Sequence, residues 1–142
     1  MKRSFVSLLV AALALVGMLG TTGVAHAATT QYRSFPLPGA CDIWVTMGTA
    51  GPDSTGTINL AGSASPYNCS SGVSYQDVKL LAQINCLTDQ EVFLKGGLFV
   101  STGYVQAYNT AVGGYTCNLR VRAKYQDGEW TQVRVYQIYP SS

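Results

Sequence analysis

Three carboxylates are the closest approach in this sequence to a catalytic set. Asp89 and Glu91 are two residues apart, and Asp77 precedes them along the chain. Residues i and i+2 of a strand share a face, and two carboxylates can act as acid and base in glycoside hydrolysis. Nothing else marks these residues, and the serines lie in Ser/Gly-rich stretches without a neighbouring base. We therefore predict a protein that is not an enzyme and has no small-molecule substrate.

The four cysteines indicate disulfides rather than a metal site. Cys41, Cys69, Cys86 and Cys117 form no C-x2-C pair, and the single histidine, His26, lies in a predicted signal peptide. An even number of cysteines in a small exported domain predicts two disulfides. No calcium loop or phosphate-binding loop is present in the sequence, so we expect no cofactor and no metal.

The N-terminus has the three parts of a secretory signal. Lys2 and Arg3 precede an apolar run over residues 5–19, and Ala25-His26-Ala27 fits the A-x-A cleavage pattern. The run is shorter than the roughly 20 residues that a membrane-spanning helix needs. We predict a signal peptide over residues 1–27, export to the extracellular space and no membrane association after cleavage.

Cleavage changes the charge of the chain. Of the nine basic residues, Lys2 and Arg3 leave with the signal, so the mature chain carries seven basic and seven acidic residues. The sequence pI near 8.4 belongs to the precursor. A neutral mature chain gives no indication of a nucleic-acid partner.

Residues 41–142 alternate with period two and contain many Tyr, Val and Thr residues, which is typical of strands. The pattern predicts an all-β fold, a small antiparallel β-sandwich of about seven strands that is immunoglobulin-like or similar. The Ser/Asn/Gly-rich residues 62–72 are expected to form a loop. The predicted strands are 42–49, 57–61, 73–85, 90–95, 98–109, 115–126 and 129–139.

The last two strands are joined by Asp127-Gly128, a sequence typical of a two-residue type I′ turn. This turn would place Leu119 opposite Tyr136 and Tyr125 opposite Trp130. The strand over residues 98–109 is expected to complete a three-stranded meander with them.

The predicted strands also suggest how the cysteines pair. Cys41 opens the first strand and Cys69 follows the return of its hairpin, whereas Cys86 ends one long strand and Cys117 begins another. The arrangement favours Cys41–Cys69 with Cys86–Cys117. The crossed alternative, Cys41–Cys86 with Cys69–Cys117, stays open.

Arg120, Arg122 and Lys124 form the one row of charges on a predicted strand face. The hairpin register places Val135 and Val133 opposite the two arginines. A solvated face accounts for such a row, but a mixture of arginine and valine is typical of a protein–protein contact. We treat the three basic residues as candidates for partner binding.

Residues 28–40 differ from the rest because they combine apolar side chains with prolines and precede the first cysteine. This extended N-terminal segment is a terminus, an edge strand of its own domain, or a peptide that docks into a partner. Pro36 interrupts strand pairing. The candidate partner-binding residues of the segment are Tyr32, Arg33, Phe35, Pro36 and Leu37.

An export signal, one small β-domain and an extended N-terminal segment together resemble the small adaptor subunits of secreted umbrella toxin particles. In that family the extended segment inserts into the cleft of a lectin-like partner, and the domain docks onto repeats of a large toxin subunit. The resemblance implies that residues 29–38 are the inserting segment, that the partners are other secreted protein subunits, and that the complex acts in bacterial competition.

Two other functions stay open. The two-disulfide format is similar to that of secreted amylase and protease inhibitors, and residues 65–70 would then be the disulfide-braced inhibitory loop. A carbohydrate-binding module would use exposed tyrosines such as Tyr104 and Tyr108 to stack on sugar rings.

Overall fold

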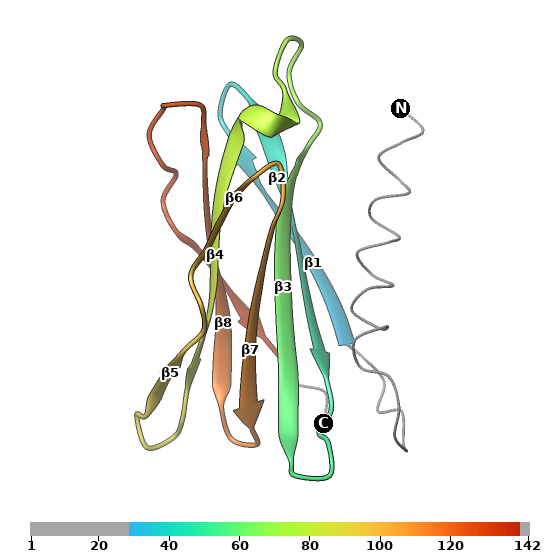
Figure 1. The fold of residues 1–142 in the computed structure, drawn as a ribbon, viewed down its shortest axis with the longest axis vertical. Coiled ribbons are helices and arrows are strands. Elements are labelled where there is room, and N and C mark those ends of the chain that lie inside the picture. The colour runs from blue at the N-terminus through green and yellow to red at the C-terminus, as the bar shows by residue number, and fades with distance from the viewer. Residues whose placement is uncertain (1–28, 140–142) are drawn as a thin grey trace.

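The computed structural model describes residues 29–139, so the predicted signal peptide lies outside the described residues. Two antiparallel sheets pack face to face (Figure 1). Sheet A has the order β1 (Thr29–Leu37), β2 (Cys41–Ala50), β3 (Thr57–Tyr67), β7 (Val105–Val112). Sheet B has the order β5 (Phe93–Lys95), β4 (Val78–Leu87), β8 (Thr116–Tyr125), β9 (Arg134–Ile138), and β6 (Phe99–Thr102) also pairs with β4. The predicted all-β sandwich is confirmed.

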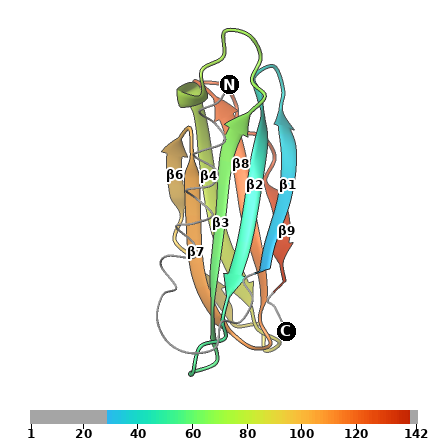
Figure 2. The same ribbon diagram turned by 90° about the vertical axis from the view of Figure 1, so that its right-hand side faces the viewer.

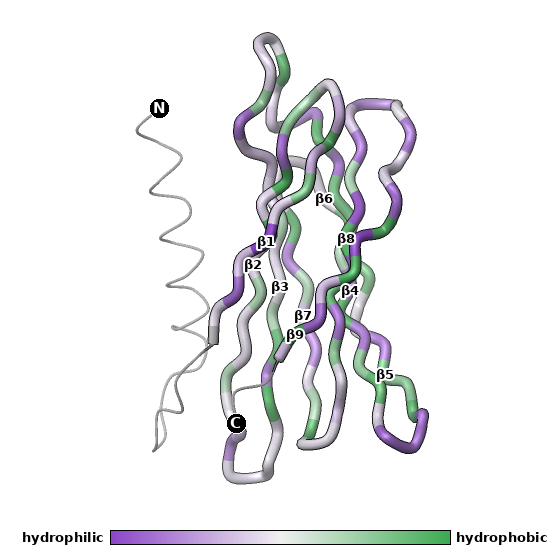
Figure 3. The backbone as a smooth tube through the Cα atoms, turned by 180° about the vertical axis from the view of Figure 1, so that it is seen from behind, coloured by the Kyte–Doolittle hydropathy of each residue, from purple (hydrophilic) through white to green (hydrophobic). Residues whose placement is uncertain are grey.

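The core lies between the two sheets and is built by alternation along each strand (Figure 3). Ile43 of β2, Leu80 of β4 and Leu119 of β8 are fully buried, while their sequence neighbours face outward. Successive strand side chains point to opposite faces, so one face of each sheet supplies the apolar surface that drives packing.

Both favoured disulfides are present. Cys41–Cys69 ties the start of β2 to the loop after β3, with a sequence separation of 28 residues. Cys86–Cys117 joins directly paired residues of β4 and β8, with a separation of 31 residues. Disulfides persist in oxidising compartments, and the pairing is compatible with such a location.

The structure has nine strands in residues 29–139, where seven were predicted after residue 40. Residues 29–37 add one strand. The predicted strand over 98–109 adds another because it is split at Gly103, whose φ of +72° breaks the extended backbone. β6 then pairs with β4 in sheet B and β7 pairs with β3 in sheet A. The predicted three-stranded meander is therefore wrong.

The bounds of β3 and β4 also differ from the prediction, and β5 begins at Phe93 rather than at residue 90. β3 continues to Tyr67, so residues 62–67 are strand rather than loop, and Gly62 faces the core against Leu119. The small and polar residues of this stretch led to the prediction of a loop. In the structure they form a strand, because small side chains allow the two sheets to approach each other closely. β4 begins only at Val78, because Tyr75–Asp77 form a 3-10 turn (η1) capped by Ser74. The amide of Gln76 donates to Ser74 Oγ at 3.3 Å.

The register of the C-terminal hairpin is partly as predicted. Leu119 pairs with Tyr136 and Arg120 with Val135, but the ladder ends at Val121 and Arg134. The Gly128 amide donates to the Tyr125 carbonyl oxygen at 3.0 Å, so the central turn residues are 126 and 127 rather than Asp127-Gly128. The predicted Tyr125–Trp130 and Arg122–Val133 pairs are absent from the ladder, because residues 126–133 form an irregular connection.

The N-terminal segment is an edge strand of its own domain. β1 pairs with β2, and its outer edge pairs with no described strand. Phe35 and Leu37 are only 4% and 6% exposed and belong to the core. Of the alternatives considered for this segment, the structure shows the edge strand.

Candidate partner-binding surface

One lateral side of the sandwich is closed by contacts between the sheets. Asn109 Nδ2 on β7 donates to the carbonyl oxygen of Ile84 at 3.0 Å and to that of Leu94 at 3.4 Å. Phe99 of β6 packs edge-on against Tyr108 of β7, with ring centroids 6.2 Å apart. In Figure 2, β6 and β7 lie together on this side, opposite β1 and β9.

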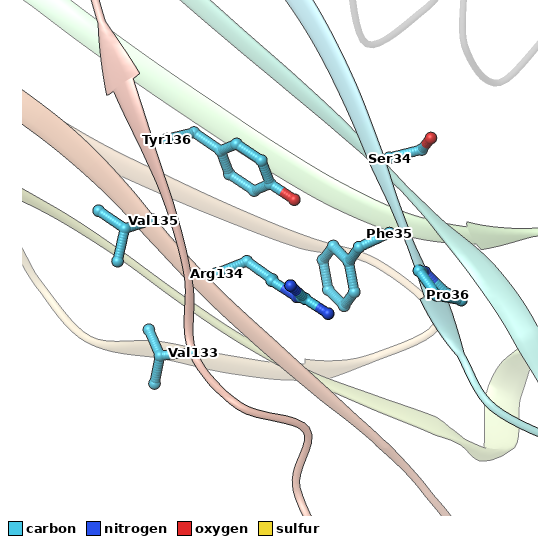
Figure 4. A pocket seen from close by; sticks show the side chains of 7 residues that line it. All are labelled: Ser34, Phe35, Pro36, Val133, Arg134, Val135 and Tyr136. Carbon is cyan, nitrogen blue, oxygen red and sulfur yellow. The ribbon is translucent and has the colours of Figure 1, made fainter.

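The other lateral side has two strand edges facing a groove. β1 ends sheet A and β9 ends sheet B, and no backbone pairing joins these two strands. Between them lies a groove of about 520 Å³, which we call the edge groove (Figure 4). Its lining residues are Ser34, Phe35, Pro36, Val133, Arg134, Val135 and Tyr136.

The edge groove is apolar and positively charged. The Arg134 guanidinium carbon lies 5.8 Å from the centre of the Phe35 ring, a cation–π arrangement that joins the two edges. Burial raises the pKa of the Tyr136 phenol, and the charges of Arg134 and Arg33 act in the opposite direction. None of the lining residues carries a carboxylate. The groove therefore suits a ligand with negative charge.

The basic row lies on the outer face of sheet B and is organised by an aromatic ring. The Arg122 guanidinium carbon is 5.0 Å from the Trp130 ring centre, and Lys124 Nζ is 5.3 Å from it. The sequence prediction placed Trp130 opposite Tyr125, on the other strand face from the basic row. The irregular connection after Gln126, whose φ is +50°, instead brings the Trp130 ring beneath the two cations.

A second, smaller hollow of about 260 Å³ lies beside the basic row. Apolar residues of β4 and of the segment before β6 line it together with the two arginines, and Leu98 among them is 59% exposed. We call the surface formed by the basic row, Trp130 and this hollow the basic face. The residues that line the hollow are Leu81, Gln83, Leu98, Arg120, Val121, Arg122 and Val133.

Val133 lines both the edge groove and the hollow of the basic face. One continuous surface is therefore bordered by both groups of candidate residues. One group comes from the N-terminal segment and the other from the row at 120–124. β9 lies between them, and Val135 on this strand is 52% exposed. The fold unites residues that are more than eighty positions apart in the sequence.

The candidate residues of the N-terminal segment are placed differently from one another. Pro36 lines the edge groove, and Phe35 and Leu37 are buried. Arg33 is exposed and donates from Nη1 to the Tyr32 carbonyl oxygen at 2.8 Å. Tyr32 is on the outer face of sheet A, with its ring centroid 5.7 Å from that of Trp44. Tyr32 is therefore not part of the groove.

Several surface residues were not identified from the sequence. Arg134, Tyr136 and Trp130 were expected only as strand residues, and Leu81 and Leu98 were not singled out. A usable signal was the density of large apolar residues around Gly96-Gly97 in the run 92–100. Most of these side chains are exposed, and an exposed apolar cluster is typical of an interaction site.

The other candidate chemistry is dispersed. Asp77 precedes β4, whereas Asp89 and Glu91 follow it, so the three carboxylates lie at opposite ends of that strand. Within residues 29–139, no three His, Cys, Asp or Glu side chains are grouped to hold a metal ion. No helix in this same range has the length and hydropathy needed to cross a membrane.

The residues considered for the two alternative functions lie away from the basic face and the edge groove. In the proposed inhibitory loop, residues 65–67 belong to β3, so the loop begins at Asn68. Tyr108 is on β7 but Tyr104 precedes it, and burial raises the pKa of the Tyr104 phenol. No family model, curated protein or solved structure matches this chain.

Proposed function

We propose that this chain is a secreted, non-enzymatic protein–protein interaction module that docks a partner on the basic face and the edge groove. The observation that supports the proposal most is that Val133 lines both hollows. It joins the candidate residues of the N-terminal segment and those of the basic row in one surface. Secretion is supported by the predicted signal peptide and by the two disulfides.

The composition of the surface supports a protein partner. Tryptophan and arginine are enriched at the energetic centres of interfaces, and here Arg122 lies over Trp130 beside exposed valines. Arg122 Nε is buried and makes no hydrogen bond within the described residues. A partner carboxylate at the exposed side of the row would neutralise its charge, so we expect an acidic partner surface.

The adaptor role implied by the resemblance needs two partner surfaces, and the sandwich offers a second one on the opposite layer. Tyr32, Trp44 and Tyr67 form a row of contacting rings across β1, β2 and β3 on the outer face of sheet A. We propose that the chain links a lectin-like subunit to a large toxin subunit in an extracellular competition complex. The outer face of one sheet would then bind one subunit, and the outer face of the other sheet would bind the other.

The test is capture of partners from culture medium by the tagged mature chain. Deletion of residues 29–38 is unsuitable, because it removes Phe35 and Leu37 from the core. The variant to use is Arg120→Glu/Arg122→Glu, with Lys95→Glu on the exposed strand β5 as a charge-reversal control away from this surface. We expect the double variant to lose a specific partner that the wild type and Lys95→Glu retain. Equal capture by all three proteins would contradict the proposal.

The alternatives are tested on the same protein. Inhibition of a secreted protease or amylase would favour the inhibitor function, and signal on a glycan array would favour the carbohydrate-binding function. Substitutions in the basic face should leave either of those activities unchanged, because Tyr108 is on β7 of sheet A and the loop after β3 does not line the hollow of the basic face.

A further inference from the structure

We infer that the edge groove accepts an extended acidic segment of the partner, which pairs with the free edge of β9 as an added strand of sheet B. The inference rests on the proposed function and names the chemistry of the segment that would enter that site. Figure 4 shows the two edges that would enclose it.

The backbone of β9 is available for pairing. β9 is the last strand of sheet B, so one of its edges pairs with β8 and the other with no described strand. Edge strands present unpaired amide and carbonyl groups, and proteins usually protect them with proline or lysine or by covering them. Arg134–Ile138 contains no proline and no lysine, its one charged residue is Arg134, and nothing described covers this edge.

The opposite wall is suited to pack against a strand rather than to pair with it. Pro36 of β1 lines the groove and has no amide hydrogen to donate. The Phe35 ring contributes an apolar surface at the base, and Val133 and Val135 contribute exposed apolar surface on the β9 side. A strand added to β9 would thus gain hydrogen bonds on one side and apolar contact on the other.

The charges select an acidic segment over a second copy of this chain. Arg134 lies in the groove, and the charge of Arg33 also acts on Tyr136. Neither Thr29–Leu37 nor Arg134–Ile138 contains an acidic residue. Two copies paired through this side would bring arginines together without a counter-charge, whereas an acidic strand would complement them.

The other lateral side cannot take a strand in the same way. Asn109 bridges β7 to the carbonyl oxygens of Ile84 and Leu94, and the Gly96 amide donates to Ile84 O at 2.7 Å. A side chain at Gly96 would collide with backbone oxygens of both sheets. The sandwich is therefore closed on that side and accessible at β9.

The experiment titrates the isotope-labelled, oxidised mature chain with three capped heptapeptides up to millimolar concentration. The first alternates glutamate and valine, the second alternates lysine and valine, and the third is the glutamate peptide N-methylated at every residue. We expect the first to shift the amide resonances of Arg134–Ile138 and slow their hydrogen exchange. The second should bind with an affinity lower by about tenfold or more, because its charges repel Arg134. The third should not bind, because it has no amide donor.

Arg134→Glu should reverse the preference between the glutamate and lysine peptides, and Arg33→Glu should weaken it. Both side chains are exposed, and a thermal melt of each variant checks that the fold is retained. Absence of glutamate-peptide binding at β9, equal affinity for the lysine peptide, or equal binding of the N-methylated peptide would each overturn the inference.

Partner capture separates this inference from the proposed function. If the peptides fail but Arg120→Glu/Arg122→Glu still abolishes capture, the added strand is wrong and the docking surface stands. If capture survives both that variant and Arg134→Glu, the proposed function is wrong and the inference falls with it.

Discussion

Arg134 of β9 lies over the Phe35 ring of β1, with its guanidinium carbon 5.8 Å from the ring centre. One residue belongs to each sheet, so this contact spans the lateral side of the sandwich on which no backbone pairing joins the sheets. The same guanidinium is close enough to influence Tyr136. The arrangement combines a cation, an aromatic ring and a phenol next to a free strand edge.

Arg134→Ala should raise the pKa of Tyr136 further. Burial raises this pKa in the native protein, and the positive charge of Arg134 opposes the rise by favouring the phenolate. The measurement is an alkaline absorbance titration, with Tyr136→Phe identifying which transition belongs to this phenol. Lys95→Ala serves as a control that should leave the titration unchanged. A fall in the Tyr136 pKa would show that Arg134 does not act on it electrostatically.

The raised pKa also predicts a pH dependence of stability. Tyr136 holds its proton more tightly in the folded state, so its contribution is complete below the usual pKa of tyrosine, about 10, and is lost as pH rises through the folded value. Tyr136→Phe cannot ionise and should lose less stability than the wild type over that alkaline range. Denaturant melts at several pH values test this, and identical pH profiles would contradict it.

Trp130→Ala should weaken partner binding, and the loss of affinity should exceed what any loss of folding stability accounts for. The Trp130 ring supports both Arg122 and Lys124, and a central aromatic residue of this kind typically contributes about 2 kcal/mol, or roughly 30-fold in affinity. Binding of the captured partner is measured by titration calorimetry. Tyr75→Ala is the control, because Tyr75 is an exposed aromatic in η1 on another part of the surface. Equal effects of the two substitutions would argue against the basic face as the contact.

Gly62→Ala should destabilise the fold through Leu119. A Cβ at Gly62 would lie 2.7 Å from Leu119 Cδ2, and overpacking of a core usually costs about 1–3 kcal/mol. Gly62→Ala combined with Leu119→Val should cost less than the sum of the two single changes, because the smaller side chain makes room. Gly113→Ala, where no atom lies within 4 Å of the added Cβ, is the control. Strict additivity in urea melts would exclude this direct contact.

Removing Cys86–Cys117 should cost more than removing Cys41–Cys69. The loops span 31 and 28 residues, so both bonds restrict the unfolded chain similarly, by about 3–4 kcal/mol. Cys86 and Cys117 are buried in the core, whereas Cys69 is partly exposed, so replacing the first pair with alanine also leaves unfilled core volume. Urea melts of the two double alanine variants give the comparison. A larger loss for the Cys41–Cys69 variant would contradict this reasoning.

Much of the fold follows from local pattern. Period two in Cys117, Leu119, Val121 and Ala123 identifies the buried face of β8 correctly. Both disulfides have the pairing that the positions of the cysteines relative to the strands favoured. The register between Leu119 and Tyr136 is the predicted one, although the turn lies one residue earlier than predicted. These features depend on neighbours in sequence and on side-chain alternation, which a single sequence displays.

The errors arise where the backbone departs from that alternation. Gly103 ends one strand and lets the next join the other sheet, and Gln126 adopts a positive φ that frees Trp130 from the hairpin. Neither change alters the apolar pattern enough to be recognised in the sequence. The sheet to which a strand belongs depends on hydrogen-bond partners that are distant in the chain. The local sequence pattern therefore could not show that the predicted meander was wrong.

The sequence by itself determined an all-β domain with two disulfides, a buried and an exposed face on most strands, and a basic row at Arg120, Arg122 and Lys124. Only the tertiary structure decided that the N-terminal segment is an edge strand, that this edge lies beside β9, and that Val133 joins its groove to the basic row. The physical reason is that alternation specifies which side chains share a face, whereas the neighbours of a sheet edge depend on how the whole chain is ordered into two sheets.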